Sequence, residues 1–282
     1  MIPIVCGLGA AAVFATATLC SSRSTRMLGP SPVLAWVMLI GLVIVVPWAL
    51  ARGVPDLDAG STGWLAVAGT GNVVGLLLAY SALRVGKVGI VAPIVSTQGA
   101  LAAVFALMAG EQLSRGAGVT LAVIAVGIVL AATARDPEPD AAGAPARRVA
   151  LLSIAAAVSF GASLYATARV SAELPIAWAL VPARVAGVLA VAAPLVLTAR
   201  LTMTRRALPL VLTSGITEVV GFSLFAIGAR HGIAVTAVLA SQFAAIAAVA
   251  AYLLFRERLT RVQVAGVATI VVGVSVLAVL QA

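Results

Sequence analysis

Residues 32–51, PVLAWVMLIGLVIVVPWALA, form an apolar stretch without a charged side chain. Its length matches the ~20 apolar residues that an α-helix needs to cross the hydrocarbon core of a bilayer. Apolar residues occupy odd and even positions alike, unlike the alternating pattern of a membrane β-strand. Similar stretches recur, and we predict ten membrane-spanning helices, at residues 2–22, 32–51, 64–83, 88–110, 116–134, 148–168, 177–198, 207–229, 233–255 and 261–280. The predicted fold class is all-α, a polytopic membrane protein.

The composition of the whole chain agrees with this prediction. Of 282 residues, 62% are hydrophobic and 10% are charged, whereas a soluble globular domain carries about 25% charged residues. Ten spans leave only ~80 residues for every loop and tail, so no large water-soluble domain fits. The net charge of +9 is spread over the ends of the predicted spans, which indicates contacts with membrane lipids and excludes a basic face for nucleic acid.

The two halves of the chain are similar to each other. A shift of 146 residues matches them without a net insertion, pairing Phe14 with Phe160, Gly41 with Gly187, Gly75 with Gly221 and Glu111 with Glu257. This pattern indicates a tandem duplication. We assign residues 1–134 to a first five-helix repeat, residues 135–147 to a polar, proline-containing linker, and residues 148–282 to a second five-helix repeat. Because five is odd, the second repeat is predicted to enter the membrane from the opposite side, inverted relative to the first.

The distribution of Lys and Arg agrees with an inverted second repeat. Between the first and second repeats, the charge-rich loops change from those after odd-numbered helices to those after even-numbered helices of the repeat. Counted this way, 13 of the 18 Lys and Arg residues fall on one side, four on the other, and Arg184 inside a span. Basic loops favour the cytoplasm, so the charge count places the 13-charge side inside and both termini outside.

Short motifs recur at matching positions of the two repeats. Ala82-Leu83-Arg84 and Ala229-Arg230 end the third and eighth spans, Glu111-Gln112-Leu113-Ser114 and Glu257-Arg258-Leu259-Thr260 form turns, and Gly127 and Gly273 lie in the last spans. With these motifs the chain resembles EamA-type members of the drug/metabolite transporter superfamily. The resemblance implies ten helices in two inverted repeats around a central cavity and, usually, export of small metabolites. It also implies cytoplasmic termini, in contrast to the charge count, so the orientation stays open.

Two helix starts carry recognisable capping patterns. Ser31 followed by Pro32 suits the N-cap and first position of the second span. Thr260 and Gln263 have the spacing of a capping box at the start of the last span.

Glu218 is the one acidic residue in the middle of a predicted span. A carboxylate is costly among lipid tails, so it should face the protein interior or a water-filled cavity. Gly221 and Phe222 follow at i+3 and i+4 on the same helical face. The repeat counterpart of Glu218 is Asn72, and we expect these two polar residues to face one another across the central axis, where such transporters bind substrate. A buried carboxyl group can carry a proton, which makes Glu218 the predicted proton-coupling residue.

Arg184 is the one basic residue well inside a predicted span. Counted from the loop between the seventh and eighth spans, Arg184 and Glu218 lie at depths that differ by roughly 5 Å. We therefore expect the two side chains to meet. Two interpretations remain open: a role in the cavity, and a salt bridge between neighbouring helices without contact to substrate.

Several other side chains are candidates for a substrate site. Gln98 and Gln242 lie in the fourth and ninth spans, close to Ser96 and Ser241, and can bind a polar solute or join helices. Tyr80, Tyr165 and Trp178 line the cavity or anchor span ends at the membrane interface. The local ion pairing of Glu111 and Glu257 with nearby arginines and an interfacial place for His231 are structural alternatives to chemistry at these residues.

The leading hypothesis is a secondary active transporter that exports a small polar or amphipathic, amino-acid-like metabolite by alternating access, with proton coupling. The alternative is translocation of a lipid or lipid-linked substrate, which an apolar, laterally open groove would favour. The sequence contains no HExxH motif and no paired intramembrane carboxylates, so we predict no enzymatic activity. It also lacks a GxxxxGK[ST] motif for ATP.

We expect a multi-pass protein of the plasma (inner) membrane with a small-molecule solute and membrane lipids as partners. No cofactor, metal or nucleic acid is expected, and the sequence is compatible with a homodimer.

Overall fold

The computed structural model describes residues 1–53, 55, 58–109, 116, 119, 120, 122–124, 126, 127, 130, 146–171, 174–229, 239, 240, 242–256 and 259–280. All the regular elements in these residues are helices. The N-terminal half contains α1 (Ile2–Leu28), α2 (Pro30–Leu50), α3 (Ala59–Val85), α4 (Val88–Ser96) and α5 (Gln98–Met108). The C-terminal half contains α7 (Ala146–Ser171), α8 (Ile176–Gly187), the π-helix η1 (Val188–Ala192), α9 (Ala193–Leu197), α10 (Leu208–Ala229), α12 (Phe243–Phe255) and α13 (Arg261–Leu280). The all-α prediction is confirmed.

Six helical segments are long and apolar enough to cross a membrane: Ile4–Leu28, Pro30–Leu50, Ala59–Val85, Ala146–Thr167, Ile176–Leu197 and Leu208–Gly228. Three shorter apolar helices, Val88–Ala102, Phe243–Phe255 and Arg261–Val276, accompany them. The chain is therefore a polytopic membrane protein. Most of the predicted fifth span, residues 116–134, and the start of the ninth lie outside the described residues, so the count of ten spans stays a prediction.

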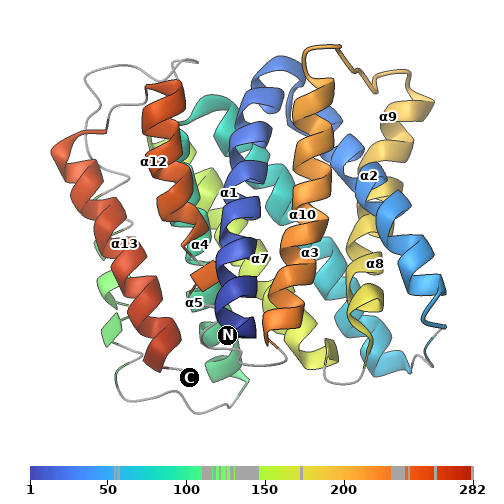
Figure 1. Ribbon diagram of the computed structural model, residues 1–282, viewed down its shortest axis with the longest axis horizontal. Coiled ribbons are helices and arrows are strands. Elements are labelled where there is room, and N and C mark those ends of the chain that lie inside the picture. Colours follow the sequence, from blue (N-terminus) through green and yellow to red (C-terminus); the bar gives the residue numbers. More distant parts are fainter. Residues whose placement is uncertain are drawn as a thin grey trace.

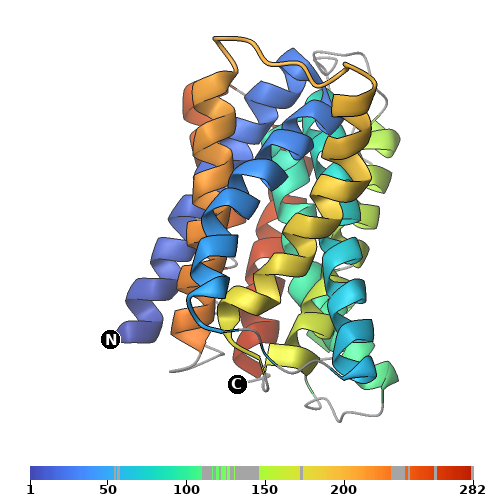
Figure 2. The same cartoon turned by 90° about the vertical axis from the view of Figure 1, so that its right-hand side faces the viewer.

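The helices form one bundle in which α1 and α7, the first helices of the two predicted repeats, run in opposite directions (Figures 1 and 2). Arg26 near the end of α1 donates hydrogen bonds to the carbonyl oxygens of Leu83 and Gly86 at the end of α3. These two helices are thus parallel. In contrast, Val149 at the start of α7 lies against Gly86, while Val170 near its end packs with Leu65 near the start of α3.

Contacts between the halves occur in pairs that exchange partners. A Cβ atom on Gly75 of α3 would stand 2.7 Å from the Phe160 ring of α7, and a Cβ atom on Gly221 of α10 would meet the Phe14 ring of α1. Each partner differs from its equivalent by 146 residues. The same exchange relates Gly41–Arg184 to Gly187–Met38, and Gly127–Ile270 to Gly273–Ile124. Glycine at these positions lets a helix approach a large side chain closely.

The core lies where α1, α2, α3, α4, α7 and α12 meet, around buried side chains such as Val37, Leu76, Ala156 and Phe243. Many large apolar side chains on the outer surface are exposed, among them Val43, Leu189 and Leu253. An apolar outer surface of this kind suits contact with lipid rather than water.

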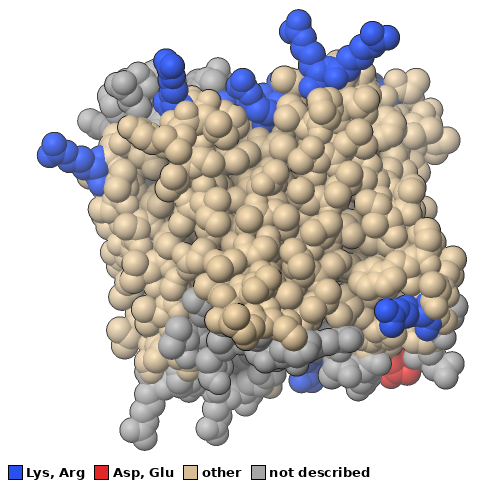
Figure 3. All heavy atoms as spheres, in the orientation of Figure 1, with Lys and Arg blue, Asp and Glu red and all other residues tan. Residues whose placement is uncertain are grey.

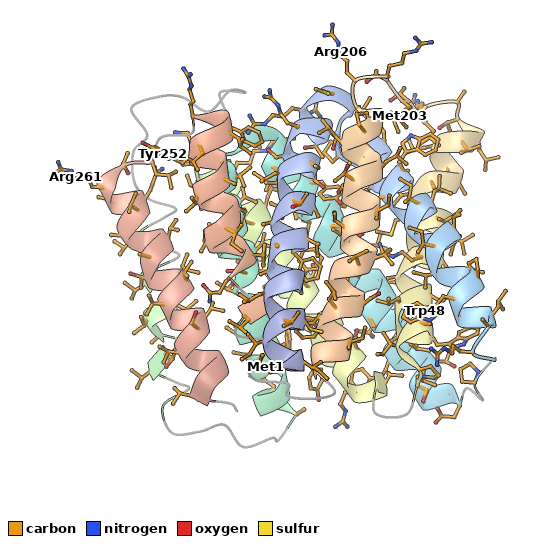
Figure 4. All side chains as sticks on the ribbon, viewed as in Figure 1. Met1, Trp48, Met203, Arg206, Tyr252 and Arg261 are labelled. Atoms are coloured by element: carbon orange, nitrogen blue, oxygen red, sulfur yellow. The ribbon has the colours of Figure 1, made fainter. Side chains whose placement is uncertain are left out.

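The positive charge gathers at the end of the bundle opposite Met1, which we call the basic end (Figure 3). Arg206 and Arg261 project from this end, away from the helices (Figure 4). Along the described chain, the loops and helix termini at the basic end contain Arg23, Arg26, Arg84, Lys87, Arg147, Arg148, Arg200, Arg205, Arg206, Arg256 and Arg261. Arg52, Asp58 and Arg169 lie near the other end, which we call the terminal end.

The predicted capping box of α13 is confirmed. The Thr260 N–H donates to Gln263 Oε1 at 2.9 Å, and the Gln263 N–H donates to Thr260 Oγ1 at 3.2 Å. The predicted start of α2 at Ser31–Pro32 is wrong, because the helix begins at Pro30 after Gly29. Gly29 has φ 89, a left-handed conformation that glycine tolerates and that completes the turn earlier.

The start of α3 also differs from the predicted span at residue 64. The helix begins at Ala59, where Asp58 Oδ1 accepts a hydrogen bond of 2.9 Å from the Ser61 N–H. This side-chain cap satisfies a backbone donor at the helix start, and it extends α3 beyond the apolar run from which the span was predicted.

Candidate functional site

A buried ion pair joins the second and third described spans of the C-terminal half. Arg184 Nη1 on α8 lies 2.7 Å from Glu218 Oε2 on α10. Arg184 is 1% exposed and Glu218 is 5% exposed. The prediction that these two side chains meet is confirmed. A buried charge pair stabilises little when complete, because desolvation offsets the attraction, but losing one partner strands the other charge.

The Arg184 side chain reaches Glu218 by crossing α2. A Cβ atom on Gly41 would stand 2.8 Å from both Cδ and Nε of Arg184, so only a glycine leaves room for the guanidinium group there. Arg184 Nη1 also lies 3.7 Å from Met38 Sδ on α2. One side chain therefore ties α8, α2 and α10 together, and it does so through a gap that Gly41 creates.

The helix that carries Arg184 is interrupted on both sides of it. Pro182 lies inside α8, and the π-helix η1 follows α8 directly. Proline removes a backbone hydrogen bond within a helix, and π-helical segments are frequent at functional sites. The corresponding segment of the first repeat, in α2, is continuous α-helix from Pro30 to Leu50.

Three buried polar atoms near the middle of the bundle form no hydrogen bond: Arg184 Nε, Glu218 Oε1 and Asn72 Oδ1. Leaving a buried donor or acceptor unpaired costs about 1–3 kcal/mol. Such atoms need an explanation, and a bound polar molecule is a common one. The ion pair thus combines both charge signs with spare hydrogen-bonding capacity.

Asn72 is 7% exposed and lies on α3, one turn beyond Gly69. A Cβ atom on Gly69 would stand 3.0 Å from the Pro182 carbonyl group, so this region of α3 packs against α8. Asn72 forms no hydrogen bond with Glu218 in the described part of the chain. The expected placement of Asn72 opposite Glu218 therefore stays a prediction.

Tyr80 lies in the protein interior at 5% exposure, which excludes the alternative that it anchors α3 at a lipid interface. Its hydroxyl group interacts with the hydroxyl groups of Ser21 on α1 and Ser214 on α10, and with the charges of Glu218 and Arg184. Ser21 Oγ and Ser214 Oγ are 2.6 Å apart. Tyr80 therefore belongs to a polar cluster that reaches the ion pair.

Phe222 belongs to an aromatic cluster on the same helix as Glu218. Its ring packs edge to face on Phe14, with ring centroids 5.3 Å apart, and Phe14 packs in the same way on Phe243 at 6.3 Å. Because edge-to-face contacts fix ring positions, the three rings form a defined apolar wall beside the polar cluster.

Gln98 and Gln242 both lie at helix breaks. Thr97 separates α4 from α5, which begins at Gln98, and Gln242 is a turn residue directly before α12. The two breaks occupy equivalent positions of the repeats. Gln242 Nε2 donates to Ser275 Oγ of α13 at 2.6 Å, so the interpretation of Gln242 as a link between helices is confirmed. Gln98 is half-buried, and its binding role stays a prediction.

Aromatic residues mark the terminal end. Trp178 Nε1 donates to the Gly53 carbonyl oxygen at 2.7 Å, and Tyr165 packs edge to face on Trp64. These positions agree with interfacial anchoring of Tyr165 and Trp178. Glu111, His231, Ser241 and Glu257 lie outside the described residues.

Sequence reasoning missed Ser21, Ser214, Met38 and Gly41. Ser214 lies one turn before Glu218, so its place on the same helical face was visible in the spacing. The contacts of Ser21, Met38 and Gly41 depend on helices distant in the sequence and gave no local signal.

Neither of two hollows found in the described structure contains the ion pair. One, of about 290 Å³, lies between α4, α12 and α13 and includes Gly89, Tyr252 and Val264. The other lies beside Arg147 and Arg148 at the start of α7. No group of three or more His, Cys, Asp or Glu side chains suited to a metal ion occurs among the residues described.

A solved crystal structure, described only as that of a protein, shares this fold. It matches with a TM-score of 0.66 at 20% sequence identity, over 99% of this chain and 98% of the other. No curated protein matches the chain. The model of the EamA-like transporter family matches twice, at residues 1–133 and 147–279, so the two matched segments begin 146 residues apart. The chain therefore belongs to the EamA-like transporter family, within the drug/metabolite transporter superfamily.

Proposed function

We propose that the protein is a secondary transporter that exports a small polar or amphipathic, amino-acid-like solute across the plasma membrane. The observation that carries the proposal is the buried Arg184–Glu218 pair, whose Nε and Oε1 atoms have no hydrogen-bond partner. A solute with a carboxylate and an ammonium group can satisfy both charges when the pair separates. The neighbouring Phe222 ring offers an apolar surface to the rest of the solute.

The transport cycle that we propose is a rocking of two inverted five-helix repeats within a ten-helix bundle around a central cavity. The exchanged contacts of Gly75–Phe160 and Gly221–Phe14 support a two-fold relation between the repeats. The opposite directions of α1 and α7 support its inversion. The helix breaks before α5 and α12 supply backbone that can bend at matched positions.

Glu218 is the proposed site of proton coupling. It is the one acidic side chain buried within a span of the described chain, and it has a cation beside it to replace when it gains a proton. Protonation would weaken its bond to Arg184 and free the guanidinium group for a carboxylate. A proton gradient thereby acts on the same residue that binds the solute.

Solute export can be tested before the solute itself is identified. Metabolites of the medium and the cytosol are compared between cells that overexpress the wild-type chain, its Glu218→Gln variant or neither. We expect one or more zwitterionic metabolites to accumulate in the medium with the wild type alone. Unchanged metabolite levels despite membrane-inserted protein would contradict the proposal. Flux of the identified solute in proteoliposomes, with and without a pH gradient, then tests the coupling separately.

Lipid translocation is the second candidate. The hollow between α4, α12 and α13 favours it, because its lining is apolar and includes the exposed side chains of Tyr252 and Val264. A lipid substrate predicts that transport survives Glu218→Gln and fails when Val264→Trp fills this hollow. The two candidates therefore give opposite results with the same pair of variants.

A further inference from the structure

Hydroxyl groups continue from Glu218 toward the basic end of the bundle. Ser214 lies one turn from Glu218 on α10, and its hydroxyl oxygen is 2.6 Å from that of Ser21 on α1. Tyr80 of α3 interacts with both serines and with the charge of Glu218. Three helices thus each contribute one hydroxyl group to a cluster beside the carboxylate.

The cluster continues along one face of α1. Ser24 and Thr25 follow Ser21 at i+3 and i+4, and both are fully buried. The Thr25 hydroxyl donates to the Ser21 carbonyl oxygen at 2.7 Å, and the Ser24 hydroxyl donates to the same oxygen at 3.3 Å. The next residue, Arg26, bonds to the end of α3 at the basic end. Buried hydroxyls therefore extend from the middle of the bundle to its basic end.

The second repeat does not reproduce this series. The residues 146 positions away from Ser21, Ser24, Tyr80 and Ser214 are Thr167, Val170, Ala226 and Ala68. Thr167 donates to the carbonyl oxygen of Ser163 in its own helix, and Val170 is buried and apolar. The path is thus present toward the basic end and interrupted toward the terminal end.

The groups that face Glu218 are few. Among the described titratable side chains, Arg184 of α8 binds it directly and Tyr80 of α3 interacts with it. The helices packed on α10 are α1 and α2. In this region α1 contributes Ser21, and α2 contributes Met38 and Gly41. A proton that reaches Glu218 from the basic end therefore has these hydroxyl groups as its polar route.

We propose that Ser21, Tyr80 and Ser214 form a hydroxyl relay that delivers protons to Glu218 from the basic end. Each hydroxyl oxygen accepts a proton from the preceding group while its own proton passes to the next, and the last proton binds the Glu218 carboxylate. No group is oxidised or reduced, and the relay hydroxyls return to their neutral form. This inference rests on the proposed role of Glu218 in proton coupling.

The relay is tested on the purified full-length chain in lipid bilayers by infrared spectroscopy after a rapid drop in pH. The carbonyl band of a protonated carboxylic acid reports on Glu218 if it disappears in Glu218→Gln. We expect Tyr80→Phe, and Ser21→Ala together with Ser214→Ala, to slow the appearance of this band about 100-fold, the lower end of what a positioned proton-transfer group contributes. Ser21→Thr keeps a hydroxyl group and should retain the wild-type rate.

Ser163→Ala is the matched control, because it removes another buried hydroxyl bond between helices, from Ser163 Oγ to the Ala68 carbonyl oxygen at 2.6 Å. It should leave the rate unchanged. Wild-type rates in folded Tyr80→Phe and in the double serine variant would overturn the relay while leaving proton coupling intact. Absence of any band that depends on Glu218 would instead overturn the coupling itself, and with it the relay.

Discussion

Gly41 lies directly beneath the Arg184 side chain, since a Cβ atom at position 41 would stand 2.8 Å from both Cδ and Nε of the arginine. Its counterpart Gly187 lies in the same way against Met38. Both glycines allow α2 and α8 to pack closely. Only Gly41 gives passage to a charged group, so the two equivalent positions should respond differently to substitution.

Gly41→Ala should push the guanidinium group away from Glu218. Overpacking of a tight interior costs about 1–3 kcal/mol, and the displaced Arg184 would lose its partner in addition. Thermal unfolding of the purified protein measures the loss. Gly63→Ala is the control, because nothing lies within 4 Å of its Cβ position in α3 and alanine favours helix by about 0.5–1 kcal/mol. Equal stability of the two variants would contradict the contact.

Arg184→Met should destabilise the protein more than Arg184→Met combined with Glu218→Asn. The single change leaves a buried carboxylate without a partner, which costs about 3–5 kcal/mol, whereas removal of both charges can be nearly neutral. The double variant also gives the second repeat the residues Met38 and Asn72 of the first. Unfolding measurements should show this recovery, while solute transport should remain absent. Recovered transport would mean that the pair has only a structural role.

Gly75→Ala and Gly221→Ala should lower stability by similar amounts, about 1–3 kcal/mol each, since both press a Cβ atom into a phenylalanine ring. Phe160→Leu should partly restore the first variant, and Phe14→Leu the second. The exchanged combinations should give no recovery. Thermal unfolding of the four double variants tests the two contacts independently, and recovery in the exchanged pairs would contradict the reciprocal packing.

Asp58 gives the start of α3 a defined pH dependence. Hydrogen bonds from the Ser61 side chain and backbone lower the pKa of Asp58. A lowered pKa in the folded state means that the stabilisation is present above the unfolded-state pKa and is lost as the pH falls through the folded-state pKa. Amide hydrogen exchange of Ser61, corrected for the intrinsic effect of pH, should therefore show weaker protection in acid. Asp58→Asn keeps a capping side chain and should remove the pH dependence.

The excess of Lys and Arg predicts that the basic end faces the cytoplasm. In a background without Cys6 and Cys20, a cysteine at Arg206 should resist an impermeant thiol reagent in intact cells, and one at Arg52 should react. Permeabilised cells supply the control, since both positions should then react. The opposite labelling pattern would place the basic end outside.

Much of the fold and the central contact were predictable because they depend on one-dimensional quantities. The apolar stretches determined the spans, and the number of residues from a shared loop gave Arg184 and Glu218 similar depths. The Thr260–Gln263 capping box depends on a spacing of three residues within one chain segment. Each of these features is local or scales with helix rise, and the sequence records both.

The remaining contacts depend on how helices rotate against one another. The passage of Arg184 over Gly41 and the Ser21–Ser214 hydroxyl pair join residues from α1, α2, α8 and α10 whose mutual orientation follows from packing of the whole bundle. Tyr80 lies near the end of a span, so its position alone favoured an interfacial anchor. The neighbouring helices instead bury its ring.

The contacts that exchange partners are those that two identical chains would make if they packed face to face with opposite orientation. In such an assembly every residue near the shared axis is present twice, so an arginine at the position of Arg184 would bring a second arginine with it. Fusion of two gene copies removes that constraint. Here the first copy has Met38 and Asn72, and the second has Arg184 and Glu218, which places a single pair of opposite charges where a symmetric ancestor would have had to hold two.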